Sequence, residues 1–404
     1  MLMINLLQAF YLDIHSDFSF GVNYYNLEET RYIKTPYVFK LNPEVVVNDN
    51  LSFFFTFIHT PSELESNISF LPRIQEAYTL INTETGIYKI GLFKKSFGLK
   101  SLVSDSNSYF ANNASRPSLF VGFEGSFNLL SSVSLNPFVS TIVNKQNYKL
   151  DNNSFEAGFD VFYKHEAQRL SLGVFFSYLS HKNVSSTNPF STFSNLAQFE
   201  QKSFNLKKII FFGKKKWHKI HTSFEIPIML GTHSTLMTST SSNNIQTFAL
   251  LSETDFLVLP TLTLNLYLGY VPGQNSSSKI NGMILHEHFQ LSPLLSVSNN
   301  KIFTRFQGTL NYDKWFFTLG SLIAFHATKG DENTSHFIQT GKTFDITDKS
   351  ITDSFYGAEI FSRIKYEVLS QFFIETFVSY AFMGKDTTSS KNPFSLGLIT
   401  SLKF

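Results

Sequence analysis

Charged side chains recur at every second position in several segments of this chain, opposite runs of Phe, Leu and Tyr. An extended strand points alternate residues to opposite faces, so the charges would share one face and the apolar residues the other. Carboxylates and cations gathered on one face can bias which ions pass through a water-filled lumen. The charged residues that fit this pattern, and are therefore candidates for lining a pore, are Glu124, Glu156, Asp160, Lys164, Arg305, Glu359, Arg363 and Lys365.

The other polar residues do not predict a metal site, a catalytic site or a cofactor. His286 and His288 would share one face of an extended segment, a spacing that suits zinc, but no third ligand lies near them in the sequence. The chain has no cysteine, which excludes thiolate chemistry. No local pairing of a nucleophile with a base stands out, and phosphate-binding glycine loops are missing.

A basic cluster with an indole, GKKKWHK, occupies residues 213–219. Such a cluster could bind the phosphate headgroups of phospholipid or lipopolysaccharide. The alternative is a purely structural role, in which the cluster is a solvated turn and its Trp lies in an interfacial aromatic belt. The formal net charge of the whole chain is only +2, which gives no general case for nucleic acid as a partner.

The elements that must carry these residues are long amphipathic strands. In 262–270 (LTLNLYLGY) every second residue is Leu or Tyr, and a similar alternation returns near the C-terminus. The chain is 16% aromatic and 16% charged, and no apolar run approaches the roughly 18 residues that a membrane helix needs. Strands of a β-sandwich are usually about five or six residues long, so alternating strands of about ten residues favour an all-β, transmembrane antiparallel barrel.

The connections between the strands predict the size and orientation of this barrel. Long polar connections alternate with short ones, about nine long and eight short, which predicts about 18 strands within a range of 16–18. Long loops would then be extracellular, and the short turns and both chain ends periplasmic. The segment 282–296 is placed inside a long loop, because counting it as a strand would break the alternation.

The chain is expected to form one domain. Residues 1–14 contain an apolar stretch without a basic region or a small-residue cleavage site, and they are interpreted as a signal remnant or as an N-terminal extension. Residues 15–404 are expected to form a single barrel, multi-pass in the bacterial outer membrane. The lipid and lipopolysaccharide of that membrane would surround it.

The C-terminal residues SLGLITSLKF place Phe404, Leu402, Leu398 and Leu396 on one face of a strand. This ending resembles the C-terminal signal of bacterial outer-membrane proteins, although Thr400 departs from the apolar pattern. The resemblance implies that Phe404 and Leu402 form an assembly signal that the barrel assembly machinery reads.

Residues 76–99 resemble a hairpin found in many outer-membrane porins, with Gly91, Phe97 and Gly98 in a Gly-x-x-x-x-x-Phe-Gly segment. Leu92 and Ser96 replace the Arg and Pro that are common in that family. The porin resemblance implies that the third long loop, 96–117, folds into the barrel, where Asp105 and Arg116 would help to set a constriction. It also implies a possible homotrimer.

The function predicted from these features is a water-filled porin for passive diffusion of small hydrophilic solutes and ions. The mixed signs of the lumen charges predict little net selectivity. A transporter of hydrophobic substrates would need an apolar lumen lining and a plug, and it is the second hypothesis. A barrel enzyme, or an adhesin that acts through its loops, is the third.

Overall fold

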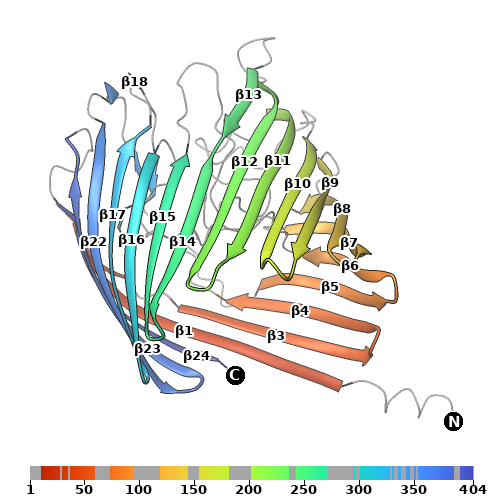
Figure 1. The fold of residues 1–404 in the computed structure, drawn as a ribbon, viewed down its shortest axis with the longest axis horizontal. Helices are drawn as coiled ribbons and strands as arrows, with labels where there is room; N and C mark the ends of the chain where they lie inside the picture. Colours follow the sequence, from red (N-terminus) through yellow and green to blue (C-terminus); the bar gives the residue numbers. More distant parts are fainter. Residues whose placement is uncertain are drawn as a thin grey trace.

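In the computed structural model the described residues are 11–27, 30–34, 37–59, 73–93, 119–143, 154–181, 202–235, 243–271, 294–295, 301–327, 330–331, 335–337, 343–345, 350–351, 354–385 and 392–403. They form one antiparallel wall of long strands that curves round on itself (Figure 1). Among these residues no helix is long and apolar enough to cross a membrane.

The wall contains 18 strands, most of them about as long as a tilted transmembrane strand must be. In chain order they are β1 (Tyr11–Leu27), β3 (Tyr37–Asn48), β4 (Leu51–His59), β5 (Arg73–Thr83), β6 (Gly86–Phe93), β7 (Leu119–Leu130), β8 (Val133–Val143), β9 (Ser154–His165), β10 (Leu170–His181), β11 (Lys202–Lys216), β12 (Ile220–Thr235), β14 (Leu250–Leu259), β15 (Leu262–Val271), β16 (Lys301–Tyr312), β17 (Trp315–His326), β22 (Phe355–Leu369), β23 (Phe372–Met383) and β24 (Phe394–Lys403).

The remaining elements are short. β2 (Thr30–Lys34) pairs with β1 and continues β3, and β13 (Asn243–Phe248) pairs with β12 and continues β14. Counting each as part of the strand that it continues reduces the 20 strand elements of the sheet to the 18 of the wall. Two small ladders lie outside this sheet, and they pair β18 (Gly330–Asp331) with β21 (Ser350–Ile351) and β19 (Ser335–Phe337) with β20 (Thr343–Asp345).

The first strand closes the barrel by pairing on both of its sides. Phe18 of β1 lies opposite Leu402 of β24 on one side and opposite Phe39 of β3 on the other. Closure leaves no free strand edge, which is what a strand-built membrane protein requires. The predicted 18-strand antiparallel barrel is therefore confirmed.

The two faces of the wall differ in residue type, as β16 shows. Ile302, Phe306 and Leu310 are exposed, whereas Lys301 and Phe303, on the opposite face, are buried. The outside of a barrel is convex and uncovered, so exposed side chains mark the outer face and buried ones point inward. Many large apolar side chains of the described wall are exposed, which suits contact with lipid.

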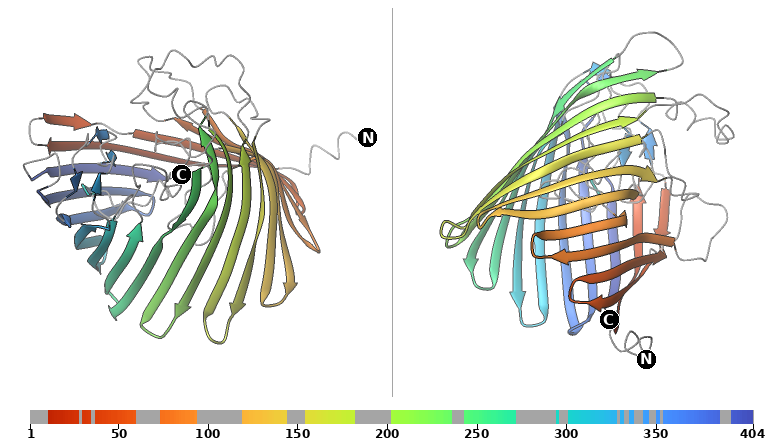
Figure 2. Two further views of the ribbon diagram at one scale, coloured as in Figure 1. Left: turned by 90° about the horizontal axis from the view of Figure 1, so that it is seen from above. Right: turned by 90° about the vertical axis from the view of Figure 1, so that its right-hand side faces the viewer.

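The described short turns join consecutive antiparallel strands at one rim of the wall. The left view of Figure 2 shows those of the yellow and green hairpins at its bottom. The ends of the described wall lie there too, because Tyr11 pairs with Val46 beside the turn at 49–50, and the amide of Lys403 donates to the carbonyl of Gln371, 2.9 Å away. The rim with the short turns, called the short-turn rim below, is the one that the sequence assigned to the periplasm.

Three boundaries differ from the sequence prediction because strand pairing extends into segments expected to lie outside strands. β1 begins at Tyr11, so residues 11–14 belong to the barrel and not to an extension before residue 15. The first of the nine long connections counted from the sequence, residues 28–34, is mostly strand β2. The basic residues 214–216 end β11, so only residues 217–219 form the turn.

Gly91, the first glycine of the porin-like hairpin, has a φ of 134°, a conformation that side chains rarely adopt. A Cβ there would lie 2.5 Å from the carbonyl oxygen of Ala77. Gly91→Ala is expected to lower the free energy of unfolding by about 1–3 kcal/mol, measured as a lower urea midpoint in lipid or detergent. Gly308→Ala is the matched control, because the nearest atom to its Cβ would be 3.4 Å away. An equal loss in both variants would contradict the argument.

Candidate channel lumen

The inward face of the wall changes character along the barrel axis. Towards the short-turn rim its residues are mainly polar, for example Asn265 on β15 and Gln307 and Thr309 on β16. Further from that rim, inward residues join one buried apolar cluster, which on β11 extends to Phe212, two positions from Lys214. This cluster contains Phe138, Phe175, Leu179, Leu206, Ile210, Phe212, Met229, Ala249, Leu251, Val271, Leu294, Leu295, Phe303, Leu322, Ala324, Tyr356 and Ala381. The lumen is therefore not polar throughout, contrary to the sequence-based interpretation.

Glu359 holds a chain segment against the inside of the wall. Its carboxylate is fully buried and accepts hydrogen bonds from the backbone N–H of Leu294, at 3.0 and 3.2 Å, and of Leu295, at 2.7 Å. The hydroxyl of Ser379 on β23 donates to the same carboxylate. The two backbone amides replace the hydration that the carboxylate loses, which makes burial of this charge tolerable.

Leu294 and Leu295 themselves are 2% and 5% exposed and belong to the apolar cluster. Leu295 also packs beside Gly357 on the inward face of β22. Neither residue is in a strand, which agrees with the placement of 282–296 in a long loop. This part of the connection between β15 and β16 therefore occupies space inside the barrel and narrows the lumen next to β22.

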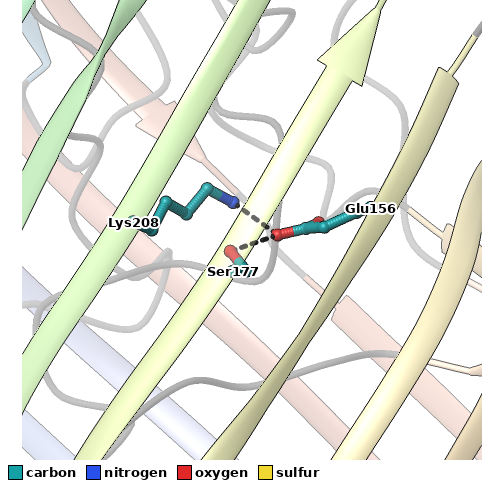
Figure 3. Close-up of polar contacts among 3 residues, drawn as sticks. All are labelled: Glu156, Ser177 and Lys208. Atoms are coloured by element: carbon teal, nitrogen blue, oxygen red, sulfur yellow. Dashed lines mark hydrogen bonds and ion pairs between the residues drawn. The ribbon is translucent and has the colours of Figure 1, made fainter.

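Glu156 and Lys208 form a buried ion pair across β10. Figure 3 shows the two side chains reaching over this strand, with the Nζ of Lys208 3.1 Å from Oε1 of Glu156. The hydroxyl of Ser177, between them on β10, donates to the same oxygen at 2.8 Å. The exposed fractions of the two charged side chains are 4% for Lys208 and 0% for Glu156, so this pair holds the wall together and is not directly open to ions in the described structure.

A second polar network lies on β14, β15 and β16. The amide of Asn265 donates to Glu253 at 3.0 Å and to Asp255 at 2.6 Å, and the hydroxyl of Tyr267 also donates to Glu253. Arg305 donates to the carbonyl oxygen of Asn265 at 3.2 Å, and its guanidinium stacks 4.3 Å from the centre of the Tyr267 ring. These contacts fix both carboxylates on the inner wall.

The remaining predicted lumen charges also lie on the inward face. Arg363 bonds Glu375 of β23 at 3.2 Å, and the Nζ of Lys365 lies 3.9 Å from the centre of the Phe373 ring. Asp160 accepts a hydrogen bond from the amide of Asn136. Elsewhere on the wall, Glu124 lies opposite Lys89 across the β6–β7 ladder, a cross-strand pair of opposite charge.

The basic cluster near residue 215 is divided between the two faces of the wall. Lys214 lies opposite Ser171 and Ser223 in the inward register, and Lys216 is also inward. Lys215 points outward, with its Nζ 5.6 Å from the centre of the Trp217 ring. Only Lys215 and Trp217 thus fit the predicted contact with lipid headgroups.

Sequence reasoning did not assign to the lumen the charged residues Lys208, Lys214, Lys216, Glu253 and Asp255. Inward and outward faces are both apolar along much of β11, so alternation there gives no indication of the side on which Lys207 and Lys208 lie. The pairing with Glu156 could be found only once β9, β10 and β11 were aligned. The predicted residues Asp105, Arg116, His286, His288 and Phe404 lie outside the described residues.

A closed 18-strand antiparallel wall with an apolar outer face is the fold of the bacterial outer-membrane porins. Among solved structures, OccK2 (OpdF) of Pseudomonas aeruginosa has a TM-score of 0.62 at 12% identity, covering 97% of this chain and 98% of that chain. OccK1 (OpdK) and OccK5 (OpdH) of the same organism have TM-scores of 0.57 and 0.56 at 10% identity, with the same coverage. No protein-family model and no curated protein matches the sequence. At these identities the similarity shows the fold.

Proposed function

We propose that this protein is an outer-membrane channel through which small hydrophilic solutes and ions diffuse passively. The observation that carries this proposal is the closed barrel with an apolar outer face and a polar inner face in the half near the short-turn rim. A barrel of this strand number leaves room for an aqueous path. The solved channels with the same fold support an outer-membrane location and a role other than catalysis.

The buried apolar cluster keeps the transporter of hydrophobic substrates as a competing hypothesis, but its residues pack on one another and on Leu294 and Leu295. An apolar solute would also meet the charged and hydroxyl-bearing residues near the short-turn rim. The passive hydrophilic channel therefore fits the lumen better. The Leu294–Leu295 segment is a constriction for which described residues give support, and loop 96–117 lies outside the described residues.

Current through single refolded barrels in a planar bilayer, recorded under a salt gradient, tests this function. Stable steps with weak ion preference are expected, because inward residues carry both signs of charge. The reversal potential measures the preference. A folded barrel that passes no current would reject the channel and favour an enzyme or an adhesin.

Selective uptake of small carboxylates is a second candidate. The structures of OccK2 with glucuronate and of OpdK with vanillate show those two channels with a carboxylate solute. Lys164, Lys214 and Lys216 would supply inward cations for such a solute here. Saturation of uptake with concentration, measured in proteoliposomes, would favour this candidate over unrestricted diffusion.

A further inference from the structure

A hollow of about 560 Å³ lies on the inner wall at the short-turn end of β9 to β14. Its inward lining follows a straight register across five strands, in which Lys164, Ser171, Lys214, Ser223 and Glu253 lie side by side. A volume of this size is typical of small-molecule sites, which are roughly 300–1,000 Å³. The hollow is therefore large enough to hold a solute at this end of the channel.

Lysines on β11 and carboxylates on β14 flank β12 in this hollow, and the further carboxylate of Glu166 pairs with Lys164 at 3.2 Å. Lys214 and Lys216 on β11 are exposed, and neither has an ion-pair partner among the described residues. Glu253 and Asp255 on β14 form the other side, each with one carboxylate oxygen bonded by Asn265. The lysines can thus attract an anionic group while the fixed carboxylates attract a cationic one.

The separation of the two sides selects the kind of solute. β11 and β14 both flank β12, so Lys214 and Glu253 are two strand spacings apart, or roughly 10 Å between backbones. The ammonium and carboxylate of a free amino acid are joined through a single Cα, so they are much closer together than these two backbones. An extended chain spans about 3.3–3.6 Å per residue, so the termini of a di- or tripeptide are roughly 7–10 Å apart.

We propose that this hollow binds short zwitterionic peptides, with the C-terminal carboxylate at Lys214 and Lys216 and the N-terminal ammonium at Glu253 and Asp255. Ser223 on β12 lies between the two charged sides, and Ser171 on β10 lies beyond Lys214. The inference rests on the proposed channel function, for which it names a class of solute. A peptide held here occupies the last part of the lumen before the short-turn rim.

The probes are trialanine, N-acetyl-trialanine, which lacks the ammonium, and trialanine amide, which lacks the carboxylate. Each is titrated into the refolded protein in detergent by calorimetry, and each is added on the short-turn side of a bilayer to measure block of the ion current. Trialanine is expected to bind about tenfold more tightly than either capped peptide, because each cap removes one charged contact.

Variants separate the two sides of the site. Lys214→Met with Lys216→Met should weaken trialanine and leave the amide unchanged, whereas Glu253→Gln with Asp255→Asn should weaken trialanine and leave the acetylated peptide unchanged. Lys207→Met, at an exposed outward position of the same strand that does not line the hollow, is the matched control. A heat-modifiability gel checks folding, and Asp255→Asn alone serves if the double carboxylate variant does not fold.

The possible outcomes distinguish this inference from the channel function. Equal binding of trialanine and N-acetyl-trialanine would reduce the hollow to a plain anion site and overturn the proposal, as would no binding by any peptide. Ion current without peptide binding would support the channel function and reject the proposed peptide site. Peptide binding without ion current would retain the site and reject the channel.

Discussion

Glu359→Ala is expected to release the Leu294–Leu295 segment from the inner wall and to raise the single-channel conductance. The variant removes the acceptor for two backbone amides and for Ser379. A hydrogen bond to a charged group contributes about 1.5–3 kcal/mol, so loss of the two amide bonds shifts the equilibrium of this segment away from the wall by roughly a hundredfold or more. The measurement is the mean current step, together with the frequency of current fluctuations, in a planar bilayer.

Glu367→Ala is the matched control for Glu359→Ala, because it also removes one carboxylate from the inner face. Glu367 lies on the same strand and face as Glu359 but near the short-turn rim, opposite Phe373. It should alter ion preference slightly without enlarging the steps. Glu359→Gln should fall between wild type and alanine, because an amide retains one acceptor oxygen. Unchanged steps in Glu359→Ala would show that the anchored segment does not limit the passage.

Lys208→Met is expected to destabilise the barrel by about 3–5 kcal/mol, since it leaves the carboxylate of Glu156 buried without its cation. The Nζ of Lys208 is 3.1 Å from this carboxylate, and both side chains are almost fully buried. The measurement is the urea concentration at which half of the refolded protein unfolds in lipid vesicles. Because the pair lies inside the wall, the loss should be insensitive to salt.

The double variant Glu156→Gln with Lys208→Met tests whether the loss comes from the pair. Removing both charges should restore most of the lost stability, because no uncompensated charge then remains buried. Lys214→Met is the control, since that lysine is exposed and unpaired among the described residues. A loss in Lys214→Met as large as that in Lys208→Met would point to a general effect of lysine removal on folding.

Much of the wall could be read from the sequence because the period of a strand is two. Each register slip would turn a whole apolar face towards the lumen, so segments such as 262–270 and 356–367 specify their own orientation. The predicted charges on β9, β16 and β22 accordingly lie on the inward face. The strand number came from counting the connections. Long and short connections alternate along the chain, and each connection joins two consecutive strands of the barrel.

β11 shows where this reasoning stops. Its inward residues Leu206, Ile210 and Phe212 are as apolar as its outward Ile209 and Phe211. Periodicity therefore gives no orientation for this strand, and Lys208 could not be assigned to the lumen. For the same reason, the sequence did not show that Lys214 and Lys216 point inward while Lys215 points outward. From the sequence, all three residues are interpreted as part of one solvated turn.

By itself the sequence determined a closed all-β barrel, its approximate strand number, its apolar outer face and the rim on which its ends lie. These properties follow from the two-residue alternation within each strand and from the lengths of the connections. Both are encoded by residues that are close together in the sequence. Only the tertiary structure decided that Glu359 anchors Leu294 and Leu295, that Glu156 pairs with Lys208, and that Lys214 and Glu253 lie in one inward row on either side of β12. Each of these arrangements involves residues separated by tens of positions, and the folding of the closed wall brings them together.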